Sequence, residues 1–220
     1  MENYDIPLLT ETTRSVEADE ERIGIISEQF QEGFGTLRDL GPCVTIFGSA
    51  RFTEDHRYYD LARRTGAAFA TAGFAVMTGG GPGIMEAGNR GAHEAGGRSI
   101  GCTIELPMEQ TGNDYIDTQV SFRHFFARKV VLVRYSQAFI MMPGGFGTLD
   151  ELFETATLIQ TGKMPGFPMV LMGTDFWNPI THFVTESLVA ERTISSEDRE
   201  LFVATDDPNE AVALVESVLG

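Results

Sequence analysis

The sequence predicts an α/β fold, in which a single domain forms a Rossmann-like, doubly wound parallel sheet and an N-terminal extension is helical. Short apolar runs alternate with segments whose apolar residues recur every three or four positions. These runs are apolar throughout, as expected of strands buried on both faces of a parallel sheet. Three of the runs end in glycine-rich loops, at the edge where such a sheet binds its ligands.

The elements are expected in the following order. A first, amphipathic helix over residues 20–40 would pack against the domain or against a second subunit. Residues 1–40 form the polar extension, and residues 41–220 form the domain. Strands are expected at residues 43–50, 74–80, 99–106, 138–145, 167–173 and 200–206. Helices are expected at residues 58–72, 82–95, 123–135, 148–161, 175–190 and 208–219, with a polar loop near residues 107–118.

Composition and charge narrow the class of protein. The 220 residues include 32 acidic residues against 16 Lys plus Arg, which gives a formal net charge of −16. Such a surface repels nucleic-acid phosphates and anionic membranes, so neither is expected as a partner. No apolar run approaches the ~20 residues of a membrane span, and the first residues lack a signal-peptide pattern. We therefore expect a cytoplasmic protein.

Metal and redox chemistry are not expected. Cys43 and Cys102 lie in apolar, strand-like runs, which is typical of buried free thiols. The four histidines are scattered without the spacing of metal ligands. The sequence therefore predicts no metal site and no cofactor.

The glycine-rich loops predict a small anionic ligand. Glycine lets backbone N–H groups approach a ligand closely, although the same residues could simply make tight turns. Ile84 stands where a dinucleotide-binding loop has its third glycine, and no P-loop Gly-Lys-Ser/Thr follows any of the loops. A mononucleotide or a sugar phosphate remains. The loop residues expected at this ligand are Gly48, Ser49, Gly80, Gly81, Gly144, Gly145, Phe146, Gly147 and Thr148.

A basic segment lies between Asp117 and Asp150. It contains four Lys or Arg residues and no acidic residue. Within a chain of strong negative charge, this segment either attracts an anion or compensates acidic neighbours. Arg128 and Lys129 are adjacent, so on a helix they point in different directions and only one of them is expected to reach the ligand.

Three carboxylates, those of Asp150, Glu151 and Glu154, directly follow the last glycine loop. Thr148 to Glu151 fits a T-x-x-E capping box, and acidic side chains suit the positive end of a helix. Alternatively, Glu151 faces a sugar, accepts hydrogen bonds from its hydroxyl groups and stabilises positive charge at the anomeric carbon. Three acids beside a phosphate would repel it, which favours the catalytic interpretation. Glu86, which follows the second loop, either contacts the ligand or favours its helix N-terminus.

Together these residues resemble the LOG family, the cytokinin-activating phosphoribohydrolases long mislabelled as lysine decarboxylases. The family's P-G-G-x-G-T-x-x-E stands intact at residues 143–151. Its second glycine motif is met in part by G-G-G-P-G-I-M-E at residues 79–86, a variant associated with the longer bacterial members. The resemblance runs from about Cys43 to the C-terminus.

The resemblance implies hydrolysis of the N-glycosidic bond of a nucleoside 5′-monophosphate, which yields free base and ribose 5-phosphate. It implies that Arg128 and Glu151 are catalytic and that the glycine loop at residues 144–148 holds the 5′-phosphate. It also implies a homodimer or a larger homo-oligomer. Further substrate contacts are implied for Glu109, Lys129, Asp150 and Thr157.

Two alternatives stay open at this point. The chain could be a general nucleoside 5′-monophosphate nucleosidase rather than one that prefers N6-alkylated adenosine monophosphate. It could also be a non-catalytic nucleotide or molybdenum-cofactor binding protein, although Glu151 together with Arg128 favours an enzyme. Lysine decarboxylation requires a lysine in Schiff-base linkage to pyridoxal phosphate, and nothing frames Lys129 or Lys163 for that role.

Overall fold

A seven-stranded parallel sheet organises the part of the chain that the computed structural model describes, residues 9, 15–105 and 112–220. Its strand order is β4-β3-β2-β1-β5-β6-β7, and every neighbouring pair is parallel. The strands are β1 (Cys43–Phe47), β2 (Ala75–Thr78), β3 (Ser99–Ile104), β4 (Thr118–Phe122), β5 (Ala138–Met141), β6 (Met169–Met172) and β7 (Phe202–Thr205). The predicted doubly wound α/β fold is therefore confirmed.

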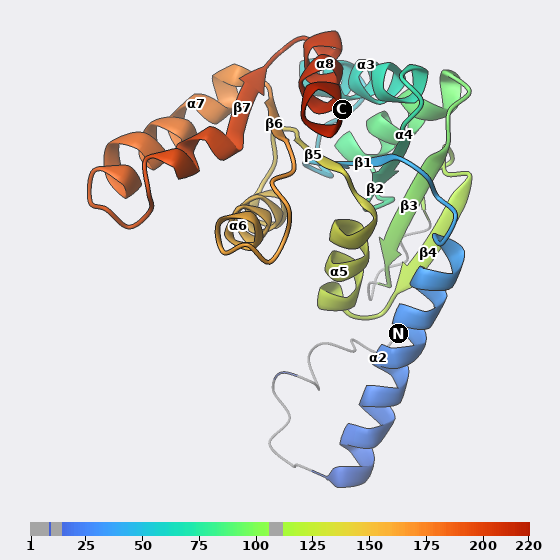
Figure 1. Cartoon of the computed structure of the whole chain (residues 1–220). Helices are drawn as coiled ribbons and strands as arrows, with labels where there is room; N and C mark the ends of the chain where they lie inside the picture. Colours follow the sequence, from blue (N-terminus) through green and yellow to red (C-terminus); the bar gives the residue numbers. More distant parts are fainter. Residues whose placement is uncertain (1–8, 10–14, 106–111) are drawn as a thin grey trace.

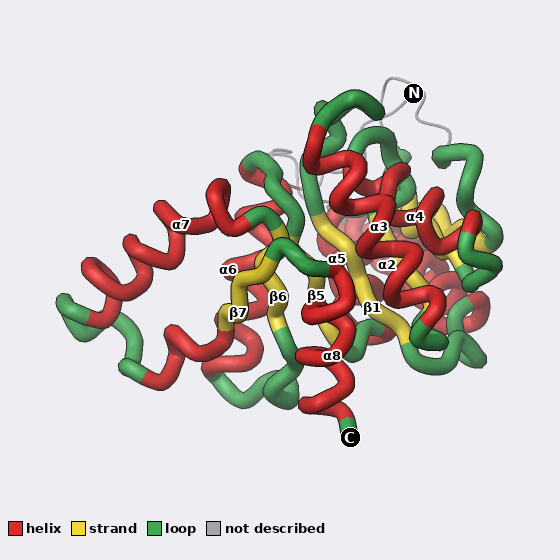
Figure 2. The backbone as a smooth tube through the Cα atoms, turned by 90° about the horizontal axis from the view of Figure 1, so that it is seen from above, coloured by secondary structure: helices red, strands yellow, loops and turns green. Residues whose placement is uncertain are grey.

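Helices cover both faces of this sheet (Figures 1 and 2). They are α2 (Val16–Thr36), α3 (Arg57–Thr71), α4 (Ile84–Glu94), α5 (Phe125–Tyr135), α6 (Phe146–Gln160), α7 (Thr174–Phe183) and α8 (Pro208–Leu219). A π-helical segment, Val184–Val189, continues α7, and a 3-10 turn, Glu197–Leu201, precedes β7.

Alternating side chains of each strand feed two separate cores. In β1, Val44 and Ile46 pack with α3, α4 and α8, whereas Cys43 and Phe47 pack with α5, α6 and α7. On the second face, Trp177 of α7 is fully buried, and its indole N–H donates to the carbonyls of Met141 and Met172, the last residues of β5 and β6, both at 3.0 Å. Strands buried on both faces explain why most of the strand runs are apolar throughout.

Strand β4 is a correction to the sequence-based expectation, which placed a loop up to about residue 118 and then a helix from residue 123. In β4, Val120 and Phe122 are buried, whereas Ser121 between them is partly exposed and Gln119 before them is exposed. This alternation is typical of an edge strand, and β4 pairs with β3 alone. A search for runs that are apolar throughout does not detect such a strand.

The chain reverses its direction across the sheet beside β1. From β1 it proceeds outward through β2, β3 and β4, and it then returns to the other side of β1 to form β5, β6 and β7. Loops after β1 and β5 therefore diverge at their carboxyl ends and leave a crevice, where open α/β sheets bind ligands.

The N-terminal helix α2 begins and ends four residues earlier than the predicted range. Its C-terminal half contacts α5 and β4, and Leu37 and Leu40 just beyond it enter the core. The N-terminal half extends past the sheet (Figure 1), where Ile23 is exposed. Among the described residues, no helix combines the length and the hydrophobicity that crossing a lipid bilayer requires.

Candidate active site

A cavity of about 710 Å³ opens in the crevice between β1 and β5. The loop after β1, the start of α4, helix α5 and the first turns of α6 contribute its walls. Its lining residues are Phe47, Gly48, Ser49, Ala50, Arg51, Gly79, Met85, Phe125, Arg128, Leu132, Gly145, Phe146, Gly147, Thr148, Leu149, Asp150 and Glu151. The structure thus brings together the first and third glycine loops, Arg128 and Glu151.

Backbone hydrogen bonds join the glycine loops to one another. Ser49, after β1, donates its N–H to the carbonyl of Pro143 at 3.1 Å and accepts one from the N–H of Ile84 at 2.9 Å. A side chain at Gly48 would collide with Ile84, because its Cβ would lie 2.4 Å from Ile84 Cγ2. The floor of the cavity is therefore a single interlocked unit of three loops.

Gly144 leaves room for the first turn of α6, and this gives a testable prediction. A Cβ at Gly144 would lie 2.0 Å from Thr148 Oγ1 and 3.1 Å from the backbone nitrogen of Ser49. We expect Gly144→Ala to lower the free energy of unfolding by about 2 kcal/mol, because the loop backbone and the first turn of α6 must move apart to make room for the added Cβ. Thermal or denaturant unfolding measures the effect.

The matched control is Gly147→Ala, since a Cβ at Gly147 meets nothing within 4 Å. Its unfolding free energy is expected to change by less than about 1 kcal/mol, and in the stabilising direction if at all, because alanine favours a helix over glycine. Equal stability of the two variants would contradict the steric argument.

Helix α6 begins at Phe146, two residues before the predicted start, and this makes the capping-box interpretation wrong. Gly145 occupies the N-cap position without a side-chain cap, and Thr148 lies inside the first turn. The first N–H groups of a helix have no partner within it, so those of α6 are available to an anion at the cavity wall. Glu151 therefore does not occupy the third position of the helix, where a capping box requires its carboxylate.

Glu151 is a buried carboxylate without a complete set of partners. Its side chain is 6% exposed, and its Oε2 accepts no hydrogen bond from any described residue. Burial raises its pKa to about 7. Lys129 and Arg128 lower that pKa, whereas Glu154 and Asp150 raise it further. A carboxyl group poised near neutral pH in a cavity is typical of a functional site.

Arg128 projects from α5 into the same cavity. Burial lowers its pKa, against the opposing effect of Glu151, and its guanidinium lies 5.1 Å from the centre of the Phe125 ring. Its Nε is buried without a hydrogen-bond partner among the described residues. A cation and a carboxylate with unused hydrogen-bonding capacity in one cavity indicate that a polar ligand completes the site.

Lys129 accounts for the two other carboxylates. Its Nζ lies 2.9 Å from Asp150 Oδ2 and 2.6 Å from Glu154 Oε2, so it links α5 to α6. Burial lowers the pKa of Lys129, but these two ion pairs outweigh burial and leave it raised. Of the adjacent pair of cations, Arg128 faces the cavity and Lys129 neutralises acids beside it.

Other predicted site residues lie elsewhere. Gly80 and Gly81 form the turn after β2, where their carbonyls accept hydrogen bonds from Asn113, and they do not line the cavity. Thr157 is exposed on α6, and its hydroxyl donates to a carbonyl of its own helix. Glu109 lies outside the described residues.

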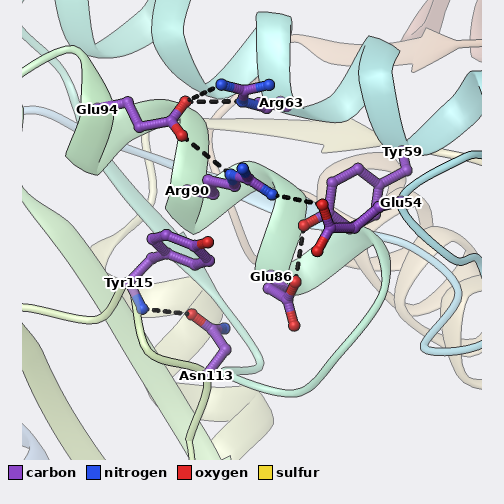
Figure 3. A network of polar contacts seen from close by, with 8 residues as sticks. All are labelled: Glu54, Tyr59, Arg63, Glu86, Arg90, Glu94, Asn113 and Tyr115. Carbon is purple, nitrogen blue, oxygen red and sulfur yellow. Dashed lines mark hydrogen bonds and ion pairs between the residues drawn. The ribbon is translucent and has the colours of Figure 1, made fainter.

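Glu86 belongs to a polar network on α3 and α4 (Figure 3). Tyr59 donates its hydroxyl to Glu86 Oε1 at 2.7 Å, and burial raises the pKa of Tyr59 to about 12. Arg90 of the same helix pairs with Glu54 at 2.8 Å and with Glu94 at 2.9 Å. Glu86 does not line the cavity, and its hydrogen bond to Tyr59 joins α4 to α3.

Sequence reasoning missed the apolar part of the cavity. The apolar side chains that line it are Phe47, Met85, Phe125, Leu132, Phe146 and Leu149, of which the glycine motif named only Phe146. In the sequence these residues match the periodicity of core positions. Met85 was expected in the core, although its place in the second glycine motif, six residues after Gly79, is a signal that could have assigned it to the site. The lining suits a ligand with an apolar or aromatic part as well as an anionic one.

The chain is similar to known proteins of one family. A family model described as "Possible lysine decarboxylase" matches residues 85–215. The chain is 32% identical over 164 residues to cytokinin riboside 5′-monophosphate phosphoribohydrolase LOG of Oryza sativa subsp. japonica, covering 72% of this chain and 66% of that protein. It is 32% identical over 112 residues to the corresponding LOG4 of Arabidopsis thaliana, covering 50% of this chain and 51% of that protein. The chain thus spans between half and two thirds of the length of these two relatives.

A solved structure shares the fold. The molybdenum cofactor carrier protein of Chlamydomonas reinhardtii superposes with a TM-score of 0.59 at 25% identity, over 81% of this chain and 98% of that chain. The family match at residues 85–215 spans more than half of the sequence and includes Arg128, Glu151 and the third glycine loop. The chain therefore belongs to this family, the LOG family, whose model carries the description of a possible lysine decarboxylase.

Proposed function

We propose that the protein hydrolyses the N-glycosidic bond of nucleoside 5′-monophosphates, with N6-alkylated adenosine monophosphate as its preferred substrate. The observation that carries this proposal is the environment of Glu151. This residue is a buried carboxylate with an unpartnered oxygen and a pKa of about 7, in a cavity that also presents Arg128 and a helix N-terminus. Membership of the LOG family and the activity for which the two plant relatives are named support the proposal.

Each end of the nucleotide has a counterpart in the cavity. The 5′-phosphate binds the free N–H groups at the start of α6, where the helix dipole favours an anion. The ribose then faces Glu151, whose carboxylate accepts hydrogen bonds from the hydroxyl groups. The base lies toward the apolar lining and Arg128.

The reaction exchanges the bond between C1′ and the base nitrogen for a bond between C1′ and a water oxygen. Glu151 stabilises the positive charge that develops at C1′ and takes the proton of the attacking water. Arg128 stabilises the negative charge of the departing base, which leaves as the free base once the proton that Glu151 took from the water has passed to it, and this returns Glu151 to its carboxylate form. Because both side chains have unused hydrogen-bonding capacity, they can make these contacts without breaking existing ones.

The pH dependence follows from the raised pKa of Glu151. Only the ionised carboxylate can stabilise positive charge and accept a proton, so we expect kcat/KM to rise with pH through about 7 and then level off. A pH–rate profile of base release measures this. A profile that is flat between pH 5 and pH 9 would contradict the role of Glu151 as a base.

The proposal is tested by measuring base release in parallel from isopentenyladenosine monophosphate, AMP, GMP and CMP. Free isopentenyladenine far in excess of the other bases supports the cytokinin-type activity. Comparable release from plain nucleotides supports a general nucleoside 5′-monophosphate nucleosidase instead. Release from none of them contradicts enzymatic function.

A non-catalytic binding protein is the second candidate, because the Chlamydomonas reinhardtii structure shares the fold and is named a molybdenum cofactor carrier. A carrier needs the glycine loops, but it does not need a buried, unpaired carboxylate beside an arginine. Purified protein that carries a pterin and releases no base would favour this candidate.

A further inference from the structure

One polar side chain of the N-terminal helix is buried against the start of α5. Gln29 of α2 is 5% exposed. Its Oε1 accepts hydrogen bonds from the backbone N–H groups of Arg123 at 2.7 Å and of His124 at 3.1 Å. Its Nε2 donates to the carbonyl of Ile25 at 3.1 Å and lies 2.8 Å from His124 Nδ1. A single side chain therefore meets both the backbone and the ring at the entry to α5.

These contacts fix the chemistry of the pair. Because Oε1 of Gln29 accepts from two N–H groups, Nε2 must face His124 and donate to its Nδ1. His124 Nδ1 is then an acceptor without a proton. His124 is also the N-cap residue of α5, and its side chain makes no capping bond to that helix. Gln29 supplies, from another helix, hydrogen bonds to both the backbone and the ring of this residue.

His124, which Gln29 contacts, is joined by a backbone hydrogen bond to Arg128, the candidate catalytic arginine. The carbonyl of His124 accepts the N–H of Arg128 at 3.2 Å, which closes the first turn of α5. Among the described residues, no ion pair or hydrogen bond holds the guanidinium of Arg128. Its position therefore depends on the backbone of this turn, on its stacking over Phe125 and on the electrostatic attraction of Glu151.

We propose that Gln29 is a positioning residue, which holds the first turn of α5 so that Arg128 is presented to the nucleotide in the cavity. The inference rests on the proposed function, because it concerns how Arg128 is placed for that reaction. Gln29 lies well before residue 85, where the family match begins. On this proposal, the N-terminal helix contributes to the geometry of the site, although it lies outside the family match.

The test compares Gln29→Met, which keeps the side-chain volume but removes the hydrogen bonds, with Gln31→Met. Gln31 is exposed on the same helix, and its side chain bonds only to Ser27 of that helix, at 3.3 Å. The first readout is backbone amide exchange by NMR. In Gln29→Met we expect exchange at His124 and Arg128 to be faster by about tenfold or more, because the first turn of α5 opens more often.

The second readout is the pH profile of base release, which a merely stabilising role would not shift. The charged groups that act on Glu151 are Arg128 and Lys129 of α5 and Asp150 and Glu154 of its own helix. Displacing Arg128 removes a charge that lowers the pKa of Glu151. The acid limb of the pH profile is the range in which the rate rises with pH. In Gln29→Met this limb should therefore move to higher pH by about 0.5 units or more, whereas in Gln31→Met it stays in place.

Identical exchange and identical acid limbs in the two variants would overturn the inference. If Gln29→Met proves unstable, Gln29→Asn makes the same test, because it withdraws the amide by one bond and should show the same changes to a smaller extent. Amide exchange needs no turnover. If the wild-type protein releases no base, the proposed function fails, while exchange still decides whether Gln29 holds α5.

Discussion

Glu151→Gln is expected to reduce base release on the order of 10³-fold while leaving the fold intact, because the neutral amide cannot stabilise positive charge at C1′. The substitution preserves shape, and the structure gives the carboxylate no capping role that the amide would lose. Glu151 has its pKa raised from 4.5 to about 7, so its ionisation opposes folding increasingly as pH rises through that range. Glutamine avoids this cost, and the variant should unfold at the same or a higher temperature at pH 8.

The measurement combines chromatographic assay of base release with thermal unfolding at pH 8. Glu154→Gln is the matched control, because Glu154 pairs with Lys129 and does not line the cavity. Loss of that partly exposed ion pair should cost less than about 1 kcal/mol and leave most of the activity. Activity near the wild-type level in Glu151→Gln, with unchanged unfolding, would refute the catalytic role.

Arg128→Met is expected to lower kcat/KM on the order of 10²-fold, since it removes the buried positive charge that faces the departing base. Methionine retains much of the apolar stem, so packing over Phe125 should persist. The same change removes a charge that lowers the pKa of Glu151. The acid limb of the pH profile should therefore move to higher pH, in the direction expected for Gln29→Met but further.

Steady-state kinetics between pH 5 and pH 9 measure both effects. Arg134→Met is the control on the same helix, because Arg134 is exposed and stacks 4.7 Å from the ring centre of Phe34, away from the cavity. The Arg134→Met variant should keep the wild-type rate and the wild-type acid limb of the pH profile. If Arg128→Met behaves like Arg134→Met, the basic segment serves only to balance charge.

The sequence predicted most of the fold because a buried parallel sheet leaves a strong pattern. Strands such as β1 and β5 are buried on both faces, and each is followed by a helical segment whose apolar residues recur every three or four positions. Strand β4 escaped this search because one of its faces is polar. The start of α6 was misplaced because Thr148 offered a good capping residue, whereas Gly145, which has no side chain to cap with, takes that position.

The candidate site was predicted less completely than the fold. Adjacent Arg128 and Lys129 indicated that one of them faces the ligand, but only the packing of α5 against α6 decides which one. Glu86 stood next to a glycine loop in sequence, yet its side chain bonds to Tyr59 of α3. The role of Gln29 depends on a contact with a residue 95 positions away, and no local pattern reports such a contact.

The interlocked loops also limit how the site of this protein can be altered. Because Ser49 bonds at once to the loop before α4 and to the loop before α6, an insertion in any one of the three would break bonds made by another. A change of substrate preference in this protein is therefore expected from exchanging exposed side chains that line the cavity, such as Phe125 and the 93% exposed Phe146, rather than from lengthening loops.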